Sequence, residues 1–221
     1  MIPLRDVIPS RTTPFVTVAF ILVNAAAWIY ELTLPRNALP GFLSLYGVVP
    51  AAFNPYAVFS SMFLHGSWSH VIGNMWYLWI FGDNVEDRMG HGRFIVFYLL
   101  CGAGAALGHV ALDPRSALPT IGASGAIAGV MGAYLVLYPR SRVLTLVPLI
   151  IFWDIIELPA VLLLGFWFLM QLFSAGAIAT TASTVGSGVA FAAHVAGFLL
   201  GMVGVFIFRK RTRHAGRWEE D

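Results

Sequence analysis

The sequence predicts an all-α membrane protein with six transmembrane helices, and composition, run length and charge placement are the observations that predict it. Of its 221 residues, 58% are hydrophobic and only 11% are charged, whereas a soluble domain carries roughly 25% charged residues. The apolar residues form runs whose lengths suit a hydrocarbon core of about 30 Å at roughly 1.5 Å per helical residue. The predicted spans are residues 14–31, 67–83, 93–112, 123–138, 158–174 and 190–208.

The basic residues orient these spans. With the N-terminus in the cytoplasm, all 13 lysines and arginines except Arg36 and Arg115 fall in inner segments, which is the positive-inside pattern. We therefore expect residues 1–13 to form a cytoplasmic N-terminal segment, residues 14–208 a six-span domain, and residues 209–221 a basic cytoplasmic tail. The pattern predicts a multi-pass protein of a plasma or inner membrane with both termini cytoplasmic.

Two apolar stretches allow other topologies. Residues 143–153 are apolar but short, and we expect an interfacial connector there, because a further span would move the basic tail outside. The first run has Arg5 and Arg11 before it and three alanines at 25–27, which are features of a cleavable signal peptide. Because the run stays apolar beyond these alanines, we expect a retained span.

Composition also limits the partners. Cys101 is the single cysteine, so no internal disulfide can form. The basic tail directly follows an apolar run, which indicates contact with a membrane surface and not with nucleic acid. We expect the lipid bilayer as a partner and predict no nucleic acid, no cofactor and no metal site.

Four polar residues are predicted to lie at one depth in the membrane: Ser124 in span four, His194 in span six, and His70 with Asn74 in span two. Ser124 and His194 each precede the inner end of their span by 15 residues, and His70 precedes it by 13. At about 1.5 Å per residue, these side chains lie ~20–22 Å above the inner boundary and roughly 8–10 Å below the outer surface. Polar groups at that depth usually face a polar cavity, so we expect a water-filled pocket open to the outside.

Small residues permit spans four and six to approach closely. They recur at every fourth position, as Gly125, Gly129 and Ala133 in span four and as Ala193, Gly197 and Gly201 in span six. Such faces allow tight helix crossing. Because Ser124 borders one face and His194 the other, packing of these faces would bring the hydroxyl beside the imidazole.

The chemistry that this pairing permits is nucleophilic catalysis. A serine hydroxyl needs a base to accept its proton, and His194 is the candidate base. Spans two, four and six hold no Asp or Glu at this level, so we expect a dyad. His70 and Asn74 lie on one helical face, and with the Ser124 amide at a helix N-terminus they can form an oxyanion hole.

Each of these residues also has a non-catalytic interpretation. A serine in a membrane helix often bonds the carbonyl of the preceding turn, and His70 with Asn74 can join two helices. A membrane histidine can instead mark a proton or ion path. His109 and Asp113, four residues apart at the outer end of span three, are an alternative base pair.

The motifs around these residues resemble those of the rhomboid family of intramembrane serine proteases, in its bacterial and archaeal six-span form. The matching motifs are Gly122-Ala123-Ser124-Gly125 in span four, His65-xxxx-His70-xxx-Asn74 in span two, Ala193-His194-xx-Gly197-xxx-Gly201 in span six, and Glu86-Asp87-Arg88-Met89-Gly90 after span two. The likeness extends from about residue 14 to residue 208. It implies a six-transmembrane-helix rhomboid-like bundle.

The resemblance also implies a role for each residue. Ser124 is the expected nucleophile and His194 the general base and acid, while His70, Asn74 and the Ser124 amide form the oxyanion hole. Structural support is expected from His65, which orders the preceding loop, and from the motif glycines Gly122, Gly125, Gly197 and Gly201.

The implied substrates are single-span membrane proteins, cut near the outer end of their span. The scissile segment must first unwind, because a helical carbonyl is engaged in its own hydrogen bond. Entry is expected past the fifth span, where Trp167 and Phe168 are candidate gate residues, and residues 175–188 resemble a flexible cap over the site.

Two departures from the family pattern stand out. The loop between the first two spans often carries Trp-Arg in this family, and here it reads Tyr56-Ala57. Many members have an aromatic residue four positions after the serine, stacked on the catalytic imidazole, and here that residue is Ala128. We therefore expect either that another ring supports His194 or that the orientation of its imidazole is looser.

The leading hypothesis is a serine endopeptidase acting inside the membrane. Two alternatives from other classes remain: a small transporter or channel whose pocket uses the same polar residues as ligands, and a non-enzymatic membrane chaperone on the same scaffold.

Overall fold

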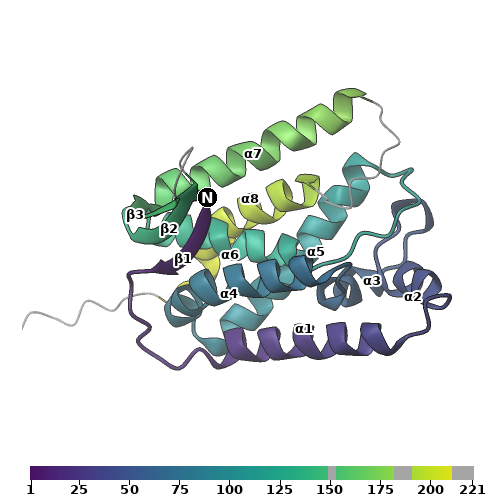
Figure 1. The fold of residues 1–221 in the computed structure, drawn as a ribbon, viewed down its shortest axis with the longest axis horizontal. Coiled ribbons are helices and arrows are strands. Elements are labelled where there is room, and N and C mark those ends of the chain that lie inside the picture. The colour runs from purple at the N-terminus through teal and green to yellow at the C-terminus, as the bar shows by residue number, and fades with distance from the viewer. Residues whose placement is uncertain (149–152, 182–190, 211–221) are drawn as a thin grey trace, which may run out of the picture.

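A bundle of long helices with a small sheet at one end forms the fold in the computed structural model, which describes residues 1–148, 153–181 and 191–210 (Figure 1). The long helices are α1 (Phe15–Thr33), α4 (Trp68–Met89), α5 (His91–Leu112), α6 (Ser124–Leu137), α7 (Ala160–Thr181) and α8 (Phe191–Phe208). They follow the predicted spans closely, so the helical membrane bundle is confirmed. α4 continues six residues past the predicted end of its span, and α7 seven residues.

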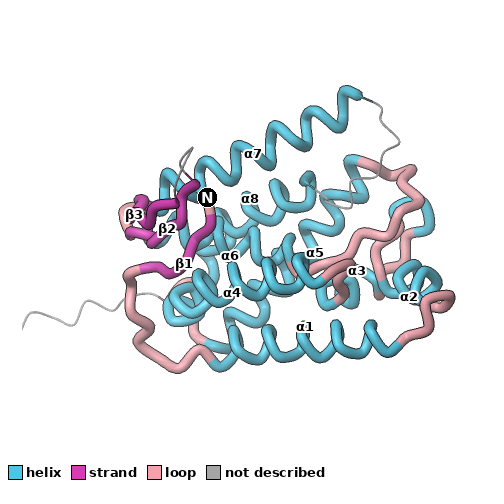
Figure 2. Tube along the Cα trace, in the orientation of Figure 1, coloured by secondary structure: helices cyan, strands magenta, loops and turns pink. Residues whose placement is uncertain are grey.

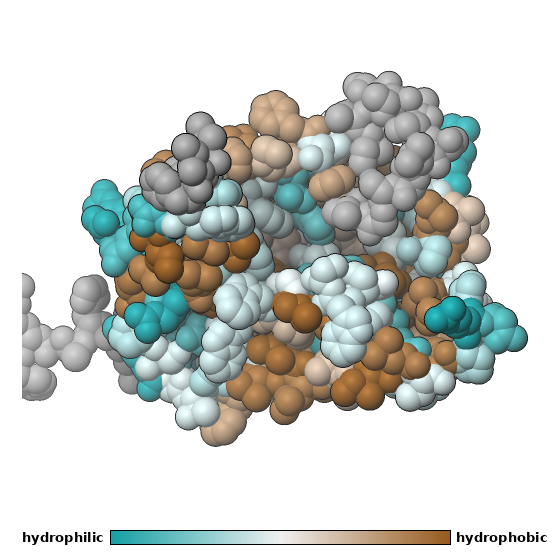
Figure 3. Space-filling view, in the orientation of Figure 1, coloured by the Kyte–Doolittle hydropathy of each residue, from teal (hydrophilic) through white to brown (hydrophobic). Residues whose placement is uncertain are grey.

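Three of these helices are long and apolar enough to cross a membrane by length and composition, namely α1, α5 and α8. Within the described residues, α6 and the 160–176 part of α7 are apolar but shorter. In the space-filling view, apolar residues are mixed with near-white ones across the middle of the visible face, and most strongly hydrophilic residues lie toward its two ends (Figure 3). This banding is the surface expected of a protein whose middle lies in lipid.

The sequence analysis did not predict the sheet, which consists of β1 (Ile2–Asp6), β2 (Arg142–Pro148) and β3 (Trp153–Pro159). Its strands are antiparallel in the order β1-β2-β3 (Figure 2). The predicted connector 143–153 therefore contributes to two strands, and its residues 149–152 lie outside the described part. β2 alternates buried Val143 and Thr145 with more exposed neighbours, the period expected of a strand with one covered face.

The opposite end of the bundle holds the segment between α1 and α4. It folds into two short α-helices and two 3-10 turns: α2 (Leu39–Tyr46), η1 (Pro50–Ala52), α3 (Ala57–Ser60) and η2 (Ser61–Phe63). Tyr56 is 85% exposed and Ala57 only 1% exposed. At the Tyr56-Ala57 departure, the segment is therefore anchored by a small buried residue that packs with Val48, Val58 and Ala106.

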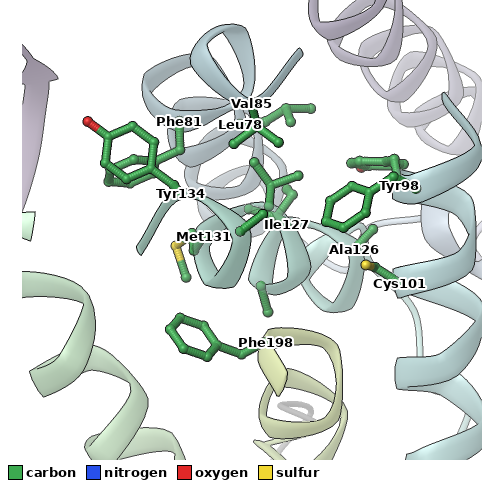
Figure 4. Packing of buried hydrophobic residues seen from close by; sticks show 14 of the residues in the cluster. Leu78, Phe81, Val85, Tyr98, Cys101, Ala126, Ile127, Met131, Tyr134 and Phe198 are labelled. Carbon is green, nitrogen blue, oxygen red and sulfur yellow. The ribbon is translucent and has the colours of Figure 1, made fainter. Parts of the chain in front are cut away.

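α6 is the centre of the bundle. Its residues from Gly125 to Tyr134 are all buried, and side chains from α4, α5 and α8 converge on them (Figure 4). Figure 4 shows Ile127 and Met131 of α6 among Leu78, Tyr98 and Phe198. A helix covered on all sides must be apolar all round, which explains why α6 has no polar face for a sequence pattern to reveal.

α6 and α8 touch through their backbones. A β-carbon added at Gly197 would lie 2.1 Å from the Gly125 carbonyl oxygen, and one at Gly201 would lie 1.9 Å from that of Gly129. These are the predicted small-residue faces, and the structure places them together in parallel register.

Buried acids join the N-terminal segment to the bundle. Glu86 at the end of α4 accepts hydrogen bonds from the backbone amides of Val16 and Thr17, at 3.0 and 2.8 Å. Asp6 of β1 accepts from the Tyr134 hydroxyl of α6 at 2.7 Å and from the Asn84 amide of α4 at 2.9 Å. The first residues of the chain are thus part of the folded unit.

Replacing Gly201 with alanine should separate α6 from α8. The new β-carbon meets backbone and not a flexible side chain, and overpacking of this kind costs roughly 1–3 kcal/mol. We expect Gly201→Ala to lower the thermal unfolding midpoint in detergent by several degrees. Gly165→Ala is the matched control, because nothing lies within 4 Å of a β-carbon at Gly165 of α7; equal losses in both variants would contradict the packing argument.

Asp6 should make stability depend on pH. Burial raises the pKa of the Asp6 carboxyl to about 6, so the folded protein binds this proton more tightly than the unfolded chain does. Its contribution therefore becomes more favourable as pH falls from about 6 towards 4, and is unfavourable above that window. We expect Asp6→Asn to be at least as stable as the parent at pH 7.5.

That advantage should shrink as the pH approaches 4, when the unfolding midpoints of parent and variant are compared across the range. Asp154→Asn is the matched control, because it removes an acidic charge at an exposed position on β3 and not at a buried one. A constant loss of stability in Asp6→Asn at every pH would show that Asp6 matters only as a hydrogen-bond acceptor.

Candidate active site

Ser124 is the first residue of α6, and a glycine turn places it there. Gly122 has φ of +121°, a backbone conformation that L side chains rarely adopt, and its amide donates to the Ser61 carbonyl at 2.8 Å. A β-carbon at Gly122 would also lie 2.7 Å from the His70 ring. The turn therefore requires glycine for its conformation and for the approach of His70.

His194 lies in the first turn of α8, opposite Ser124. Its Nε2 is 2.7 Å from the Ser124 Oγ, a normal hydrogen-bond distance. The separation along the chain is 70 residues, and the glycine contacts between α6 and α8 close it. The structure thus brings together the pair that the sequence singled out as nucleophile and base.

Gln171 of α7 is a third member that the sequence analysis missed. Its Oε1 is 2.7 Å from the His194 Nδ1. An amide oxygen only accepts, so Nδ1 carries the proton and the lone pair of Nε2 faces the serine hydroxyl. The sequence does contain a feature that could have revealed this residue, because Gln171 interrupts the apolar run of residues 160–173. A polar group in a membrane helix usually faces the bundle interior.

Aromatic rings flank the imidazole. The Trp167 ring lies 5.9 Å from that of His194 at an interplanar angle of 34°, and the Phe191 ring lies at 6.5 Å and 84°. Ala128 is fully buried and has no ring to pack on the imidazole. Trp167 is therefore the ring that packs beside His194 in this structure. Phe168 stacks on Phe198 of α8 with 4.7 Å between ring centroids, and the Trp167 ring lies tilted to Phe198 at 5.9 Å.

His70 and Asn74 line the same pocket as the serine. This pocket encloses about 510 Å³, and its walls include Ser124, His194, His70, Asn74 and Gly122. A β-carbon at Gly122 would lie 2.7 Å from the His70 Nε2 and 3.6 Å from the Asn74 Nδ2. Two side-chain nitrogens therefore converge beside the turn that leads into the serine.

His65 lies behind this pair. Its ring Nε2 is 3.1 Å from the Asn74 Nδ2, and its ring meets that of His70 edge to face, at 5.1 Å between centroids. The residue is only 1% exposed. His65 thus contacts both side chains that the sequence analysis assigned to the oxyanion hole.

The remaining candidates lie elsewhere. His109 and Asp113 are not among the pocket-lining residues. Residues 175–181 of the predicted cap belong to α7, and 182–188 lie outside the described part. Within the described ranges, no three His, Cys, Asp or Glu side chains gather in a way that could hold a metal ion.

A second cavity of about 500 Å³ lies between α1 and α4. Its walls are apolar and include Trp28, Trp68, Trp76 and Trp79. It holds no nucleophile or titratable group, so it offers no chemistry.

The fold and the site together define a class of protein, namely an integral membrane protein that pairs a serine with a histidine inside a helical bundle. The Rhomboid domain model matches residues 52–211. This match covers most of the chain and includes all four motifs. The chain belongs to the rhomboid family.

Relatives from distant organisms agree with this assignment. The chain is 33% identical over 196 residues to the chloroplastic rhomboid-like protein 11 of Arabidopsis thaliana, covering 86% of this chain and 64% of the relative. It is 31% identical over 169 residues to rhomboid-like protease 5 of Toxoplasma gondii, covering 74% of this chain and 17% of that protein. A rhomboid protease of Bacillus subtilis is 37% identical over 79 residues, covering 36% of this chain and 15% of that protein. The chain therefore spans less than two thirds of the length of these relatives.

Removing the Gln171 side chain should weaken catalysis if His194 acts as a base. Without its acceptor, Nδ1 no longer fixes the ring, and a hydrogen bond worth about 1 kcal/mol corresponds to roughly a five- to tenfold loss of rate. We expect Gln171→Ala to lower kcat by this factor in a reconstituted cleavage assay. Met170→Ala, at an exposed neighbouring position on α7, should leave kcat within about twofold, and the same loss in both variants would argue against an orienting bond.

Proposed function

We propose that the protein is a serine endopeptidase that hydrolyses peptide bonds inside the membrane. The observation that carries the proposal is the 2.7 Å contact between the Ser124 Oγ and the His194 Nε2. Membership of a family whose relatives include named proteases supports it.

The proposed reaction begins when the Ser124 Oγ attacks the substrate carbonyl carbon and its proton passes to the His194 Nε2. The tetrahedral intermediate then collapses, the carbon–nitrogen bond breaks, and Nε2 returns the proton to the leaving amine. The acyl group remains on Ser124 as an ester. Water attacks this ester with His194 again as the base, which releases the acid product and restores the hydroxyl.

The intermediate carries a negative oxygen that needs hydrogen-bond donors. His70, Asn74 and the Ser124 amide are the proposed donors. The convergence of the two side-chain nitrogens beside Gly122 supports this role, and the first amides of α6 lie in the positive field of a helix N-terminus. One such donor typically contributes roughly 3–4 kcal/mol to the barrier.

The proposed substrates are single-span membrane proteins, cut near the outer end of their span. Access past α7 is the proposed route. Several large side chains of α7 are exposed, among them Phe166, Leu169 and Phe173, while Trp167 and Phe168 form its aromatic contact with α8. These two residues are the proposed gate.

The proposed topology has six spans and both termini in the cytoplasm, with residues 14–208 as the protease domain, 1–13 as the N-terminal segment and 209–221 as the tail. Pairing of β1 with β2 supports one part of it, because it puts the N-terminus on the same side as the connection between α6 and α7. The charge pattern assigns that side to the cytoplasm. A plasma or inner membrane is the proposed location.

Replacing Ser124 or His194 with alanine should abolish cleavage. Loss of either member removes the covalent route, and we expect kcat to fall by at least about a thousandfold. The measurement is cleavage of a single-span reporter in proteoliposomes, with the product resolved by mass.

The control is Ser44→Ala, at an exposed position on α2, which should cleave like the parent. Full activity in Ser124→Ala or His194→Ala would overturn the proposal. Reporter binding without any cleaved product in the parent would favour a chaperone, and solute flux that survives serine-directed covalent inhibitors would favour a transporter.

A further inference from the structure

Glu31 is a buried carboxylate that the proposed reaction does not use. It lies two residues before the end of α1 and is 3% exposed. No ion pair to Glu31 is present among the described residues. A carboxylate in such a place is costly unless it is hydrogen-bonded, so its contacts should reveal why it is there.

The contact is with the backbone of a single residue. The His65 amide donates to the Glu31 Oε1 at 3.1 Å and lies 3.4 Å from the Oε2. A carboxylate that accepts from a buried backbone amide makes one of the stronger hydrogen bonds in proteins. Glu31 therefore fixes the backbone of His65, in the loop just before α4, to the end of α1.

The side chain of His65 carries this fixed position to the pocket. Its Nε2 lies 3.1 Å from the Asn74 Nδ2. Because an amide nitrogen only donates, Nε2 accepts this bond. One hydrogen of the Asn74 amide is thereby bound to His65, and the second is left for the pocket.

We propose that Glu31 is a positioning residue for the oxyanion hole, which it orders through His65 and Asn74. The inference rests on the proposed peptidase function and deepens it. Glu31 does not line the pocket and touches no reacting atom. Its effect passes along three hydrogen-bonded residues, from the carboxylate to the His65 backbone, and from the His65 ring to the Asn74 amide.

Loss of the Glu31 carboxylate should displace the Asn74 amide, the proposed oxyanion-hole donor. The His65 amide would be left without an acceptor in a site where the residue is 1% exposed, and a buried unpaired amide drives rearrangement. The loop can regain a partner only by moving, which moves the ring that holds Asn74. Oxyanion-hole donors must lie about 2.7–3.1 Å from the developing charge, so small shifts reduce their effect.

A purely structural role for Glu31 is the alternative, and Glu86 provides the comparison. Glu86 is also a buried glutamate, at 1% exposed, and it accepts backbone amides at the opposite end of α1. It also accepts the Thr17 hydroxyl and contacts His91. It does not line the pocket. Both residues thus accept backbone amides at opposite ends of one helix, and Glu31 is the one connected to a proposed donor.

The first test compares Glu31→Leu with Glu31→Gln in the full chain, reconstituted in proteoliposomes with a single-span reporter. Glu31→Leu should lower kcat by roughly 10–100-fold, part of the effect of a whole donor, with KM within about twofold, because the donor acts in the transition state and not in the bound substrate. Glu31→Gln keeps a carbonyl acceptor and should restore kcat to within about threefold of the parent.

Glu86→Leu is the matched control. It should lower the unfolding midpoint while kcat per folded enzyme stays within about twofold of the parent. If Glu31→Leu shows the same pattern, with lost stability and unchanged kcat, the positioning role is overturned. If Glu31→Leu does not fold, Glu31→Asp serves in its place, because it keeps the charge and withdraws the acceptor by about 1.5 Å; unchanged kcat in folded Glu31→Asp overturns the inference as well.

A double-mutant cycle tests the route. If Glu31 acts through Asn74, adding Glu31→Leu to Asn74→Ala should lower kcat by less than about threefold, whereas adding it to Gln171→Ala should multiply the two losses. Equal effects of Glu31→Leu in the parent and Asn74→Ala backgrounds would overturn the inference. That result leaves the peptidase function standing, which fails if Ser124→Ala or His194→Ala remains active.

Discussion

The backbone contact between α6 and α8 is the constraint on which the rest of the structure depends. Where Gly197 meets Gly125, and Gly201 meets Gly129, no side chain fits between the two helices. In lipid, packing of this kind replaces the hydrophobic effect as the force that joins helices. The same contact fixes the register of Ser124 against His194, so the stability of the bundle and the geometry of its polar pair have one origin.

Most polar residues of the pocket are tolerated in the membrane because they bond one another, although the His65 Nδ1 is buried without a hydrogen-bond partner among the described residues. Gln171 bonds His194, which bonds Ser124, and a second chain joins Glu31, His65 and Asn74. Each bond removes a cost that an unpaired group would impose in a dry interior. A network bonded in this way has few alternative arrangements, which is the preorganisation that electrostatic catalysis requires.

Regular spacing and depth made the bundle and the paired residues predictable. The glycine repeats and the equal distances of Ser124 and His194 from their inner span ends carried that information in the sequence itself. Gln171 and Glu31 were missed because the partner of each lies more than twenty residues away, and the sequence does not show which group each one meets. The sheet was missed for a related reason: β1 and β2 pair across most of the chain, and neither strand shows a strong pattern alone.

α7 connects these separate features. It begins directly after β3, so its first residues are tied to the sheet, whose first strand contacts α4 and α6 through Asp6. Farther along the same helix, Gln171 bonds the His194 Nδ1 and the Trp167 ring lies beside the His194 ring. If substrate enters past α7, the helix that yields to the substrate is also the helix that orients His194. Such a base would be fully oriented only when α7 lies against α8, and hydrolysis would then wait until the helix had closed behind the substrate.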